Sequence, residues 1–577
     1  MVGFFLVSCS DFLSRYPEDK IASEDFFRNE REINLYANSF YQKAMPGDGI
    51  AKSDGVSDIT AVVSVSNYLT SGYTSQDQGG WSWSILTNIN YFISRVEKSP
   101  VSRELKDKYI GLARFWRAMF YFDKVKQFGG VPYYDFYLDA DSEELYAPRN
   151  TRIEVMEKVL EDVNFAVDNL DEENSSTRTI VTKNVALALK ARLCLFEGTF
   201  RKYHNEMNLP DAAKWLELAA DAATMIIETG EYSLHNTGNP DSDYRDLFVA
   251  TERSGVSEIS KEIIWAQVYD TELLRWHDVT WKYNSATYGS RWSLTRPFVN
   301  SYLNVDGSRF TDKENYDEVP FAQECANRDK RLKQTVRTPG FTRLNGVKAL
   351  PDFSVTLTGY QIMKWCLDDP YFDGRKEATN AMPIFRYAEI LLILAESKAE
   401  LGEFNSTVWN QTIRPLRQRA GVNPIEPVVA DNFLTDTFYP GITDKYLLEI
   451  RRERAIEFIA ENVRYYDLIR WKLASQLDAR NSKWTGIYVP ELGKPFDIDN
   501  DGKLDVCFYL GSCPAKIENV KYYPLNDNIS VTDLVNKKGN LVWGQNFVRE
   551  WNDKKYLRPI PYSVMVVNPN IEQNPQW

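Results

Sequence analysis

Residues 105–132 read LKDKYIGLARFWRAMFYFDKVKQFGGVP and decide the fold. Apolar side chains recur along this stretch at intervals of three and four residues, which is the period of an amphipathic helix. Gly129 and Gly130 come next, and Pro132 lies just beyond them, a combination that typically stops a helix. The stretch therefore predicts one long helix over Leu105–Phe128 that ends at the glycine pair.

Further amphipathic patterns lie on both sides of this helix. They predict helices at 25–44, 83–96, 151–170, 184–200, 211–228, 385–403 and 443–473. Thr151 and Glu154 have the spacing of a helix capping box. A clean copy of the 34-residue tetratricopeptide repeat is missing, so the prediction rests on helices in series. We expect a mainly α fold: a tetratricopeptide-like helical solenoid scaffold with a long irregular, aromatic-rich insertion and little β structure.

The pattern of residues changes along the chain. We expect a single domain over 9–577, made of N-terminal helical repeats (24–230), an irregular insertion (231–382), returning helices (383–475) and an irregular C-terminal part (476–577). One short strand is expected at Glu262–Tyr269. Long irregular segments in a compact protein usually carry function, so the insertion is the expected ligand-binding region.

Composition excludes several classes of protein. The chain has 577 residues, of which 43% are hydrophobic and 26% charged, so it is neither disordered nor a low-complexity polymer. No stretch approaches the roughly 20 apolar residues of a membrane-spanning helix. The formal net charge of −13 is unfavourable for binding nucleic acid. Aromatic residues reach 14% of the chain, which leaves rings for a binding surface as well as the core.

Cysteine and histidine are sparse. The six cysteines are Cys9, Cys194, Cys325, Cys366, Cys507 and Cys513. They form no CxxC pair and no cluster with histidine, so a structural zinc site is not expected. Cys507 and Cys513 either close a small disulfide loop or stay free, and the sequence leaves both alternatives open. Only three histidines are present, which argues against a histidine-based mechanism.

The first residues, MVGFFLVSC, look like the end of a bacterial lipoprotein signal. A short apolar run and a small residue precede Cys9, the position at which such proteins are cleaved and lipidated. The basic start of a full signal peptide is missing, so we interpret 1–8 as a residual signal. The alternative is a buried first strand or helix with an incidental cysteine. Several acyl chains on Cys9 would hold the protein stably on a membrane.

Four segments, taken together and in order, carry a family resemblance. They are RFWRAMFYF (114–122) with FGGVP (128–132); PIFRYAEILL (383–392) with Ala395 and Glu396; Glu453, Arg454, Glu457, Glu461, Arg464, Asp467, Leu468, Arg470 and Trp471; and LRPIP (557–561) with Asn568, Pro569, Gln573, Asn574 and Pro575. The set resembles the SusD/RagB family of Bacteroidetes outer-membrane lipoproteins. The start at Cys9 is also similar to that family's mature start. Two departures are Asn462, where the family usually has glycine, and Ser397, where it usually has alanine.

The resemblance implies a location and a partner. It implies a lipid-anchored, surface-exposed protein of the cell outer membrane that associates with a SusC-like TonB-dependent transporter, its helical repeats facing that transporter. It also implies capture of oligosaccharide, or less often of peptide, without catalysis. No cofactor is expected, apart from a structural Ca²⁺ considered below.

The charged residues of the third segment have two interpretations. Glu453, Glu457 and Glu461 lie one helical turn apart, with Arg454 and Arg464 nearby, which favours an ion-pair network joining the last two helices. The alternative is the carboxylate pair of a retaining glycosidase, whose carboxyls lie about 5–5.5 Å apart. Flanking arginines lower carboxyl pKa values, whereas a general acid needs a raised pKa. The pattern therefore favours structural support.

Two aromatic segments are the candidate ligand sites, because a sugar's C–H face packs on flat rings while its hydroxyls bond to polar neighbours. The first segment holds Tyr73, Gln76, Asp77, Gln78, Trp81 and Trp83. The second holds Trp276, Trp281, Tyr283, Asn284, Tyr288, Arg291 and Trp292. The alternative for each ring is that it packs a loop onto the helices, and Trp83 is the ring for which this alternative is strongest.

An acidic stretch, DIDNDGKLD at 497–505, matches the first half of a calcium-binding loop. Asp497, Asp499 and Asp501 stand at the first three ligand positions, and Gly502 at the sharp turn. Asp505 falls at the ninth position, but Phe508 replaces the usual bidentate glutamate. The alternatives are a structural Ca²⁺ site and a solvated acidic turn, and the sequence favours neither.

The sequence thus predicts a cell-surface glycan-binding lipoprotein that takes part in polysaccharide utilisation and delivers oligosaccharide to its transporter. Three rivals stay open: a peptide-binding member of the same family, a glycoside hydrolase, and a protein adaptor of tetratricopeptide type. A deep closed pocket would favour peptide, release of reducing sugar would favour the hydrolase, and a lack of any sugar affinity would favour the adaptor.

Overall fold

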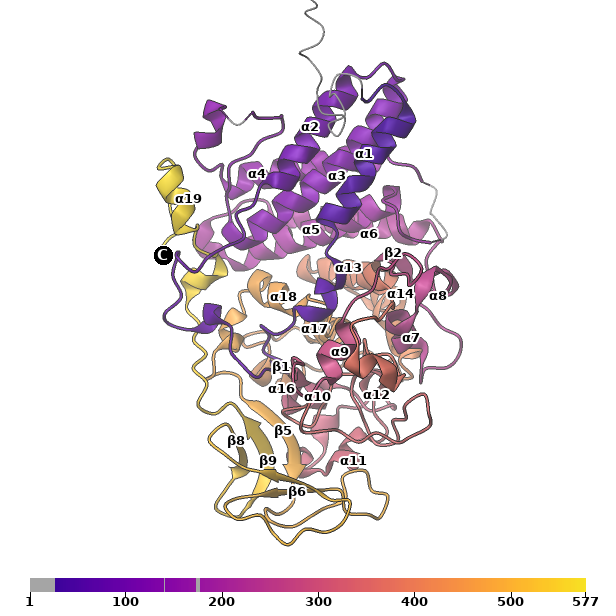
Figure 1. Cartoon of the computed structure of the whole chain (residues 1–577), viewed down its shortest axis with the longest axis vertical. Helices are drawn as coiled ribbons and strands as arrows, with labels where there is room; N and C mark the ends of the chain where they lie inside the picture. The colour runs from indigo at the N-terminus through magenta and orange to yellow at the C-terminus, as the bar shows by residue number, and fades with distance from the viewer. Residues whose placement is uncertain (1–25, 140, 173–176) are drawn as a thin grey trace, which may run out of the picture.

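The computed structural model describes residues 26–139, 141–172 and 177–577. The chain is mainly helical with a few small sheets, as predicted (Figure 1). One large cluster of buried apolar side chains reaches from Phe27 to Ile571. Within the described residues, every helix is either too short or too polar to cross a lipid bilayer.

Six helices form the N-terminal part, at the top of Figure 1. They are α1 (Glu30–Ala44), α2 (Ser84–Lys98), α3 (Arg103–Phe128), α4 (Arg152–Asn169), α5 (Lys183–Tyr203) and α6 (Ala212–Glu228). Each lies within a few residues of its predicted range. Helices α3 and α4, α4 and α5, and α5 and α6 pack in succession. This series is the solenoid that the sequence predicts.

Local signals explain where these helices begin and end. Thr151 and Glu154 form the predicted capping box of α4. After α3 the chain reverses at Gly129, whose φ of +74° suits glycine. A Cβ on Gly130 would lie 2.2 Å from the Asn150 carbonyl oxygen, so only glycine fits there. The glycine pair therefore both ends the helix and allows the chain to pack against the start of α4.

The insertion at 231–382 contains more short helices than its sequence suggests. They are α7 (Asp243–Val249), α8 (Glu252–Glu258), α9 (Val279–Asn284), α10 (Arg296–Ser301), α11 (Phe321–Cys325) and α12 (Arg331–Thr335). Strand β2 (Ile263–Gln267) confirms the predicted strand and pairs antiparallel with β4 (Met382–Arg386). Strand β1 (Thr60–Ala61) pairs antiparallel with β3 (Ser293–Leu294), which ties the N-terminal loop to the insertion.

The returning helices lie in the middle of Figure 1. They are α13 (Tyr387–Glu400), α14 (Ser406–Gln411), α15 (Ile413–Arg419), α16 (Asn432–Thr437), α17 (Lys445–Glu457) and α18 (Arg464–Arg470). The helical pattern over 443–473 is broken between α17 and α18, because Ala460 (φ +59°) and Asn462 (φ +60°) are left-handed. Asparagine tolerates this conformation, as expected for Asn462.

The prediction of an irregular C-terminal part is wrong in one respect. This part holds most of the strands, which lie at the bottom of Figure 1. They are β5 (Trp484–Val489), β6 (Val506–Tyr509), β7 (Lys521–Pro524), β8 (Ile529–Asp533) and β9 (Lys538–Trp543). Strand β9 lies between β5 and β8 in an antiparallel sheet, and β6 pairs parallel with β7. The chain then returns to the N-terminal helices, where α19 (Tyr562–Val567) is followed by Asn568, which donates to the Ala147 carbonyl oxygen.

Pairs of an arginine with a buried carboxylate link different helices. Arg117 of α3 pairs with Asp162 of α4, Arg152 of α4 with Glu197 of α5, Arg192 of α5 with Glu389 of α13, and Arg470 of α18 with Glu396 of α13. All four carboxylates are buried. Since a buried charge is costly without its partner, each pair fixes which helix lies against which.

Candidate functional site

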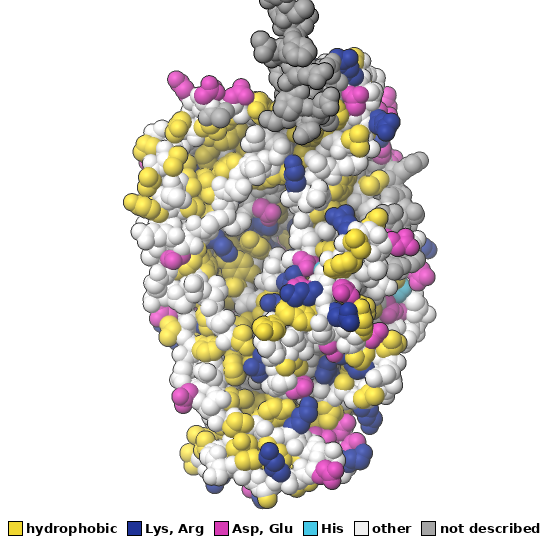
Figure 2. Space-filling view, in the orientation of Figure 1, with side chains coloured by type: hydrophobic (Ala, Val, Ile, Leu, Met, Phe, Trp, Pro, Cys, Tyr) yellow, Lys and Arg dark blue, Asp and Glu magenta, His cyan; other side chains and the backbone are white. Residues whose placement is uncertain are grey.

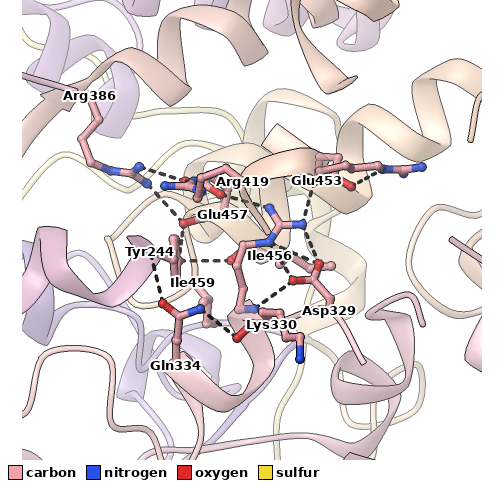
Figure 3. A network of polar contacts seen from close by, with 12 residues as sticks. Tyr244, Asp329, Lys330, Gln334, Arg386, Arg419, Glu453, Ile456, Glu457 and Ile459 are labelled. Carbon is pink, nitrogen blue, oxygen red and sulfur yellow. Dashed lines mark hydrogen bonds and ion pairs between the residues drawn. The ribbon is translucent and has the colours of Figure 1, made fainter. Parts of the chain in front are cut away.

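A buried network of charges surrounds α17, and Glu457 lies at its centre (Figure 3). Its carboxylate accepts hydrogen bonds from Arg331 (3.0 Å), Arg386 (2.9 Å) and Arg419 (2.6 Å). Glu453 accepts from Arg331 and Arg417, and Glu461 from Arg386 and Lys364. The network draws on α12, β4, α15 and α17, and so holds the returning helices against the insertion.

This arrangement confirms the ion-pair prediction. Arg454 of α17 donates to Asp467 of α18 at 3.0 and 2.8 Å, which joins the last two helices. Burial alone would raise the pKa of Glu457, but Arg419, Arg386 and Arg331 outweigh it and hold that pKa below its ordinary value. Glu453 has a lowered pKa for the same reason. These carboxylates are buried and already bonded, so they support the fold rather than act as a glycosidase pair.

The first aromatic segment packs on α3 and on the C-terminus. The rings of Trp81 and Trp83 are half-buried, with Trp81 edge-on to Phe128 (5.0 Å between centroids) and Trp83 edge-on to Phe120 (5.4 Å). Tyr73 packs edge-on against Trp577, and its hydroxyl donates to Gln78. Packing is therefore the main role of these rings.

The polar residues of this segment differ in their exposure to solvent. Gln76 and Asp77 are exposed, whereas Gln78 is buried. The Asp77 carboxylate accepts hydrogen bonds from the backbone and hydroxyl of Thr74 and so closes the loop on itself. Of the residues predicted here, Gln76 and Asp77 are exposed, and Tyr73, Trp81 and Trp83 are each only partly accessible.

The second segment provides an exposed ring surface. The rings of Trp281 and Tyr288 stack at 6.2 Å between centroids and 23° between planes, and Tyr288 is 71% exposed. The ammonium of Lys376 lies 4.2 Å from the centre of the Trp281 ring. Asn284 lies three residues after Trp281 on α9, which brings the two side chains to one face of the helix. Trp276, just before α9, is 40% exposed.

Three other predicted residues of this segment serve as support. Tyr283 is only 2% exposed and donates its hydroxyl to the Ala51 carbonyl oxygen, so its assignment as a ligand residue is wrong. Trp292 is half-buried and packs edge-on against Tyr283. Arg291 is half-buried and donates to the Phe353 carbonyl oxygen. Tyr283 is buried because α9 packs on the 3₁₀ helix η2 (Gly47–Lys52), which covers that side of the helix.

Sequence reasoning missed the other half of this surface, the 3₁₀ helix η8 (Pro370–Gly374), which packs on α9. Tyr371 is 47% exposed, and the Arg375 guanidinium lies 4.4 Å from the centre of its ring. Asp373 accepts a hydrogen bond from Asn284 at 2.8 Å. The PYFDGRK sequence at 370–376 was the available signal. We call Trp281, Asn284, Tyr288, Tyr371, Asp373 and Lys376 the α9–η8 surface.

A central cavity, which the sequence did not predict, lies between α3, α5, α13 and α18. Its volume is about 340 Å³, and its lining includes Phe122, Leu195, Ile393, Lys126 and Arg192. Figure 2 shows a hollow close to the position of α18, with hydrophobic side chains on its floor and basic ones beside it. The lining is mostly apolar because these helix faces meet there without closing completely. The residues that line it are far apart in sequence, so no local pattern announces the cavity.

A second hollow, of about 440 Å³, lies on α1 and α2 and is lined mainly by rings. Phe26, Tyr36 and Tyr91 face it, with Leu35 at its edge 58% exposed. Tyr36 and Tyr91 lie 6.1 Å apart at 36°. The amphipathic pattern of 25–44 predicted Phe26, Leu35 and Tyr36 as part of a helix face, but not as part of a hollow.

The acidic loop has part of the predicted calcium-binding geometry. Asp497, Asp499 and Asp501 each bring a carboxylate oxygen to within 4.8 Å of the others. Gly502 (φ +87°) makes the sharp turn, and its N–H donates to Asp497 at 2.7 Å. Asp505 is not part of the triplet, because its carboxylate accepts from the backbone of Ile498. Burial, and next the charge of Asp501, raises the pKa of Asp499, as mutual repulsion of the carboxylates requires.

The cysteines are placed as follows. Cys9 lies outside the described residues, so its lipidation stays a prediction. Cys507 is buried, Cys513 is exposed, and both are free thiols, as are Cys194, Cys325 and Cys366. Of the two alternatives left open for Cys507 and Cys513, the structure therefore has the free pair.

Comparison with known proteins finds relatives along almost the whole chain. A family model described as the SusD family matches residues 261–577, and one described as starch-binding associating with outer membrane matches residues 11–195. A SusD-like protein of Bacteroides ovatus is 24% identical over 568 residues, which cover 92% of each chain. SusD-like protein P38 of Formosa agariphila is 24% identical over 504 residues, covering 82% of this chain and 90% of that protein.

Solved structures share the fold. A SusD-like carbohydrate-binding protein from Bacteroides fragilis superposes with a TM-score of 0.70 at 21% identity, covering 95% of this chain and all of that one. A second SusD-like protein from the same species gives 0.67 at 21%, with 98% and 100% covered. A structure described as containing xylogluco-oligosaccharide gives 0.60 at 19%, with 93% and 97% covered. The predicted fold class is thereby confirmed.

Proposed function

Since the chain belongs to the SusD family, we propose that it captures glycans outside the cell and passes them to an outer-membrane transporter. The observation that carries this proposal is the stacked pair Trp281–Tyr288 on the α9–η8 surface, in which Trp281 is half-buried and Tyr288 is 71% exposed. The family model described as starch-binding and the structural neighbour described with a xylogluco-oligosaccharide support a sugar as the ligand.

The chemistry of the α9–η8 surface suits a sugar chain. Tyr288 and Tyr371 offer largely exposed rings on which the C–H face of a pyranose can lie. The polar groups of this surface are the Asn284 amide, the Asp373 carboxylate and the Lys376 ammonium, which can bond to sugar hydroxyls. Asn284 and Asp373 are held by each other, by Gln361 and by Arg343. Trp281 belongs to α9 and Tyr371 to η8, so these two rings lose little side-chain freedom when a ligand binds.

A calorimetric screen of the purified protein against polysaccharides tests this site. For a glycan that binds, Trp281→Ala and Tyr288→Ala should each weaken affinity about tenfold, a loss of about 1.4 kcal/mol. Tyr562→Ala is the matched control, since Tyr562 is also exposed but lies on α19. A ligand whose affinity is unchanged in both variants, but reduced in Trp81→Ala, would move the site to the first segment.

The same samples test the absence of catalysis. We propose that the bound glycan leaves unaltered, since Glu453, Glu457 and Glu461 are buried and engaged with arginines or lysine. Prolonged incubation of protein and glycan should therefore release no reducing ends above the protein-free blank. Release that exceeds the blank, and that disappears in Tyr288→Ala, would identify a glycoside hydrolase.

The location and the partner belong to the same proposal. We propose that Cys9 carries the lipid, that the body lies on the outer surface of the outer membrane, and that a SusC-like TonB-dependent transporter receives the glycan. Cys9→Ser should shift the protein from the membrane fraction to the soluble fraction of cells. Cells that lack the SusC-like transporter should no longer take up the glycan but should still bind it at their surface.

The central cavity favours a second candidate function, the capture of peptides. The apolar part of its lining, which includes Phe122, Leu195 and Ile393, suits a hydrophobic side chain of a peptide. Lys126 and Arg192 already pair with Asp123 and Glu389. Leu195→Trp, which fills the cavity, should then abolish binding of a peptide library without changing glycan affinity. Glycan affinity lost in Leu195→Trp and kept in Tyr288→Ala would place the sugar in the cavity instead.

A further inference from the structure

A second group of metal-ligating side chains lies where the connection after α6 meets the first turn of α7, remote in sequence from the acidic loop. His235, Asp243 and Asp246 each bring one ligand atom to within 4.8 Å of the others. Nε2 of His235 and an oxygen of Asp246 lie 3.7 Å apart. This distance is too long for a hydrogen bond, but two ligands of a single zinc ion lie about 3–4 Å apart.

The carboxylate of Asp243 is an independent indication that a cation binds here. It is fully buried, and its Oδ1 accepts from the backbone N–H of Thr237 at 3.0 Å and from its hydroxyl at 2.6 Å. Its Oδ2 is also buried and accepts no hydrogen bond. Among the described residues, no lysine or arginine lies within ion-pair distance of this carboxylate. A buried carboxylate without a cation is costly, and a metal ion bound at Oδ2 would remove that cost.

The three ligands are held on anchored backbone. The N–H of His235 donates to Glu262 at 2.6 Å, and Glu262 belongs to the buried network through Arg386. The first turn of α7 is held by Gln334, which accepts from the N–H groups of Tyr244 and Arg245. His235 is 14% and Asp246 40% exposed in their side chains, so the group opens to solvent on one side. An ion can therefore enter without unfolding.

We propose that His235, Asp243 and Asp246 bind one divalent transition-metal ion, Zn²⁺ in particular. An imidazole nitrogen with two carboxylates is a donor set that suits zinc, whereas Ca²⁺ and Mg²⁺ prefer oxygen ligands only. Three protein ligands leave the fourth position of a tetrahedral ion to water. The bound ion fixes the connection between α6 and α7, where the helical repeats pass into the insertion.

Titration of chelator-treated full-length protein with zinc chloride tests the site. Calorimetry should show one saturable site, and Asp243→Asn and Asp246→Asn should each weaken it at least about tenfold. Asn keeps the acceptor for Thr237, and Asp246 is a surface residue, so at least the Asp246 variant should fold. Asp241→Asn is the control, because Asp241 lies on the same connection but pairs with Lys333.

Two further measurements, of melting temperature and of visible absorption, complete the test. Zinc should raise the melting temperature of the parent and of Asp241→Asn, but not of Asp246→Asn. Co²⁺ in place of zinc should give visible absorption with the parent that His235→Ala abolishes. The proposal is overturned by an absence of saturable zinc binding in the parent, by binding that both aspartate variants retain at full affinity, or by an equal loss in Asp241→Asn.

Discussion

Arg464 and Asp58 form a buried two-bond ion pair across 406 positions of the chain. Nε donates to Oδ1 at 2.8 Å and Nη2 to Oδ2 at 2.7 Å. Arg464 begins α18, and Asp58 lies in the loop that leads to β1. The pair therefore fastens the N-terminal loop to the last of the returning helices.

Asp58→Asn should loosen this loop. The substitution leaves Arg464 buried without its counter-charge, a loss of about 3–5 kcal/mol. Amide hydrogen exchange at residues 56–62 should become much faster. Asp107→Asn, which removes a half-buried partner of the exposed Arg103, is the control and should leave exchange in this loop unchanged. Equal protection of the loop in both variants would contradict the role given to Asp58.

Glu457→Gln should destabilise the whole fold. The change removes the negative charge that Arg331, Arg386 and Arg419 share, so about 3–5 kcal/mol of the free energy of unfolding should be lost. Chemical denaturation measures this loss. Glu403→Gln breaks an exposed pair with Lys398 and should cost less than about 1 kcal/mol. A similar small loss for Glu457→Gln would show that the network adds little.

Stability should fall on mild acidification because of His277. Burial lowers the pKa of His277 to about 4, and the neutral ring fits its site: Nε2 faces the Asn380 carbonyl oxygen, and Nδ1 accepts from the Val279 N–H. The unfolded chain binds a proton on this histidine near its ordinary pKa of 6.5. The contribution of the neutral His277 to the free energy of unfolding is thus fully present above about pH 6.5. It is lost as the pH falls toward about 4, and the total loss is about 3 kcal/mol.

The measurement is the free energy of unfolding of the parent and of His277→Gln at pH 7 and at pH 4.5. The variant should be less stable at pH 7, but its stability should change less between the two values. The difference between the two proteins isolates His277 from the carboxyl groups that titrate in the same range. Parallel pH profiles would contradict a neutral, buried imidazole.

The acidic loop should respond to calcium. Calcium bound by Asp497, Asp499 and Asp501 would replace their mutual repulsion with attraction. Addition of millimolar CaCl₂ to chelator-treated protein should then raise the melting temperature, and Asp499→Asn should abolish the increase. Asp527→Asn, in another surface turn, is the control. An unchanged melting temperature in the parent would establish the solvated acidic turn.

Much of the fold could be predicted because its signals are local. The period of apolar residues, the glycine pair after Phe128 and the capping residues Thr151 and Glu154 each act within one or two helical turns. The sequence thus placed α1 to α6 and α13 within a few residues. The C-terminal strands were missed because they are short, with four to six residues each. The pairing of β5 with β9 also joins residues far apart in sequence.

The sequence by itself determined the helical scaffold, the family resemblance and which segments are rich in rings. Only the tertiary structure decided which rings face water: Tyr283 and Tyr288 stand five positions apart, yet the first is covered by η2 and the second is free. The same holds for Asp243, whose unmatched charge is evident only once the chain has closed around it. Burial depends on residues brought from distant segments, and that information is not contained in any local pattern.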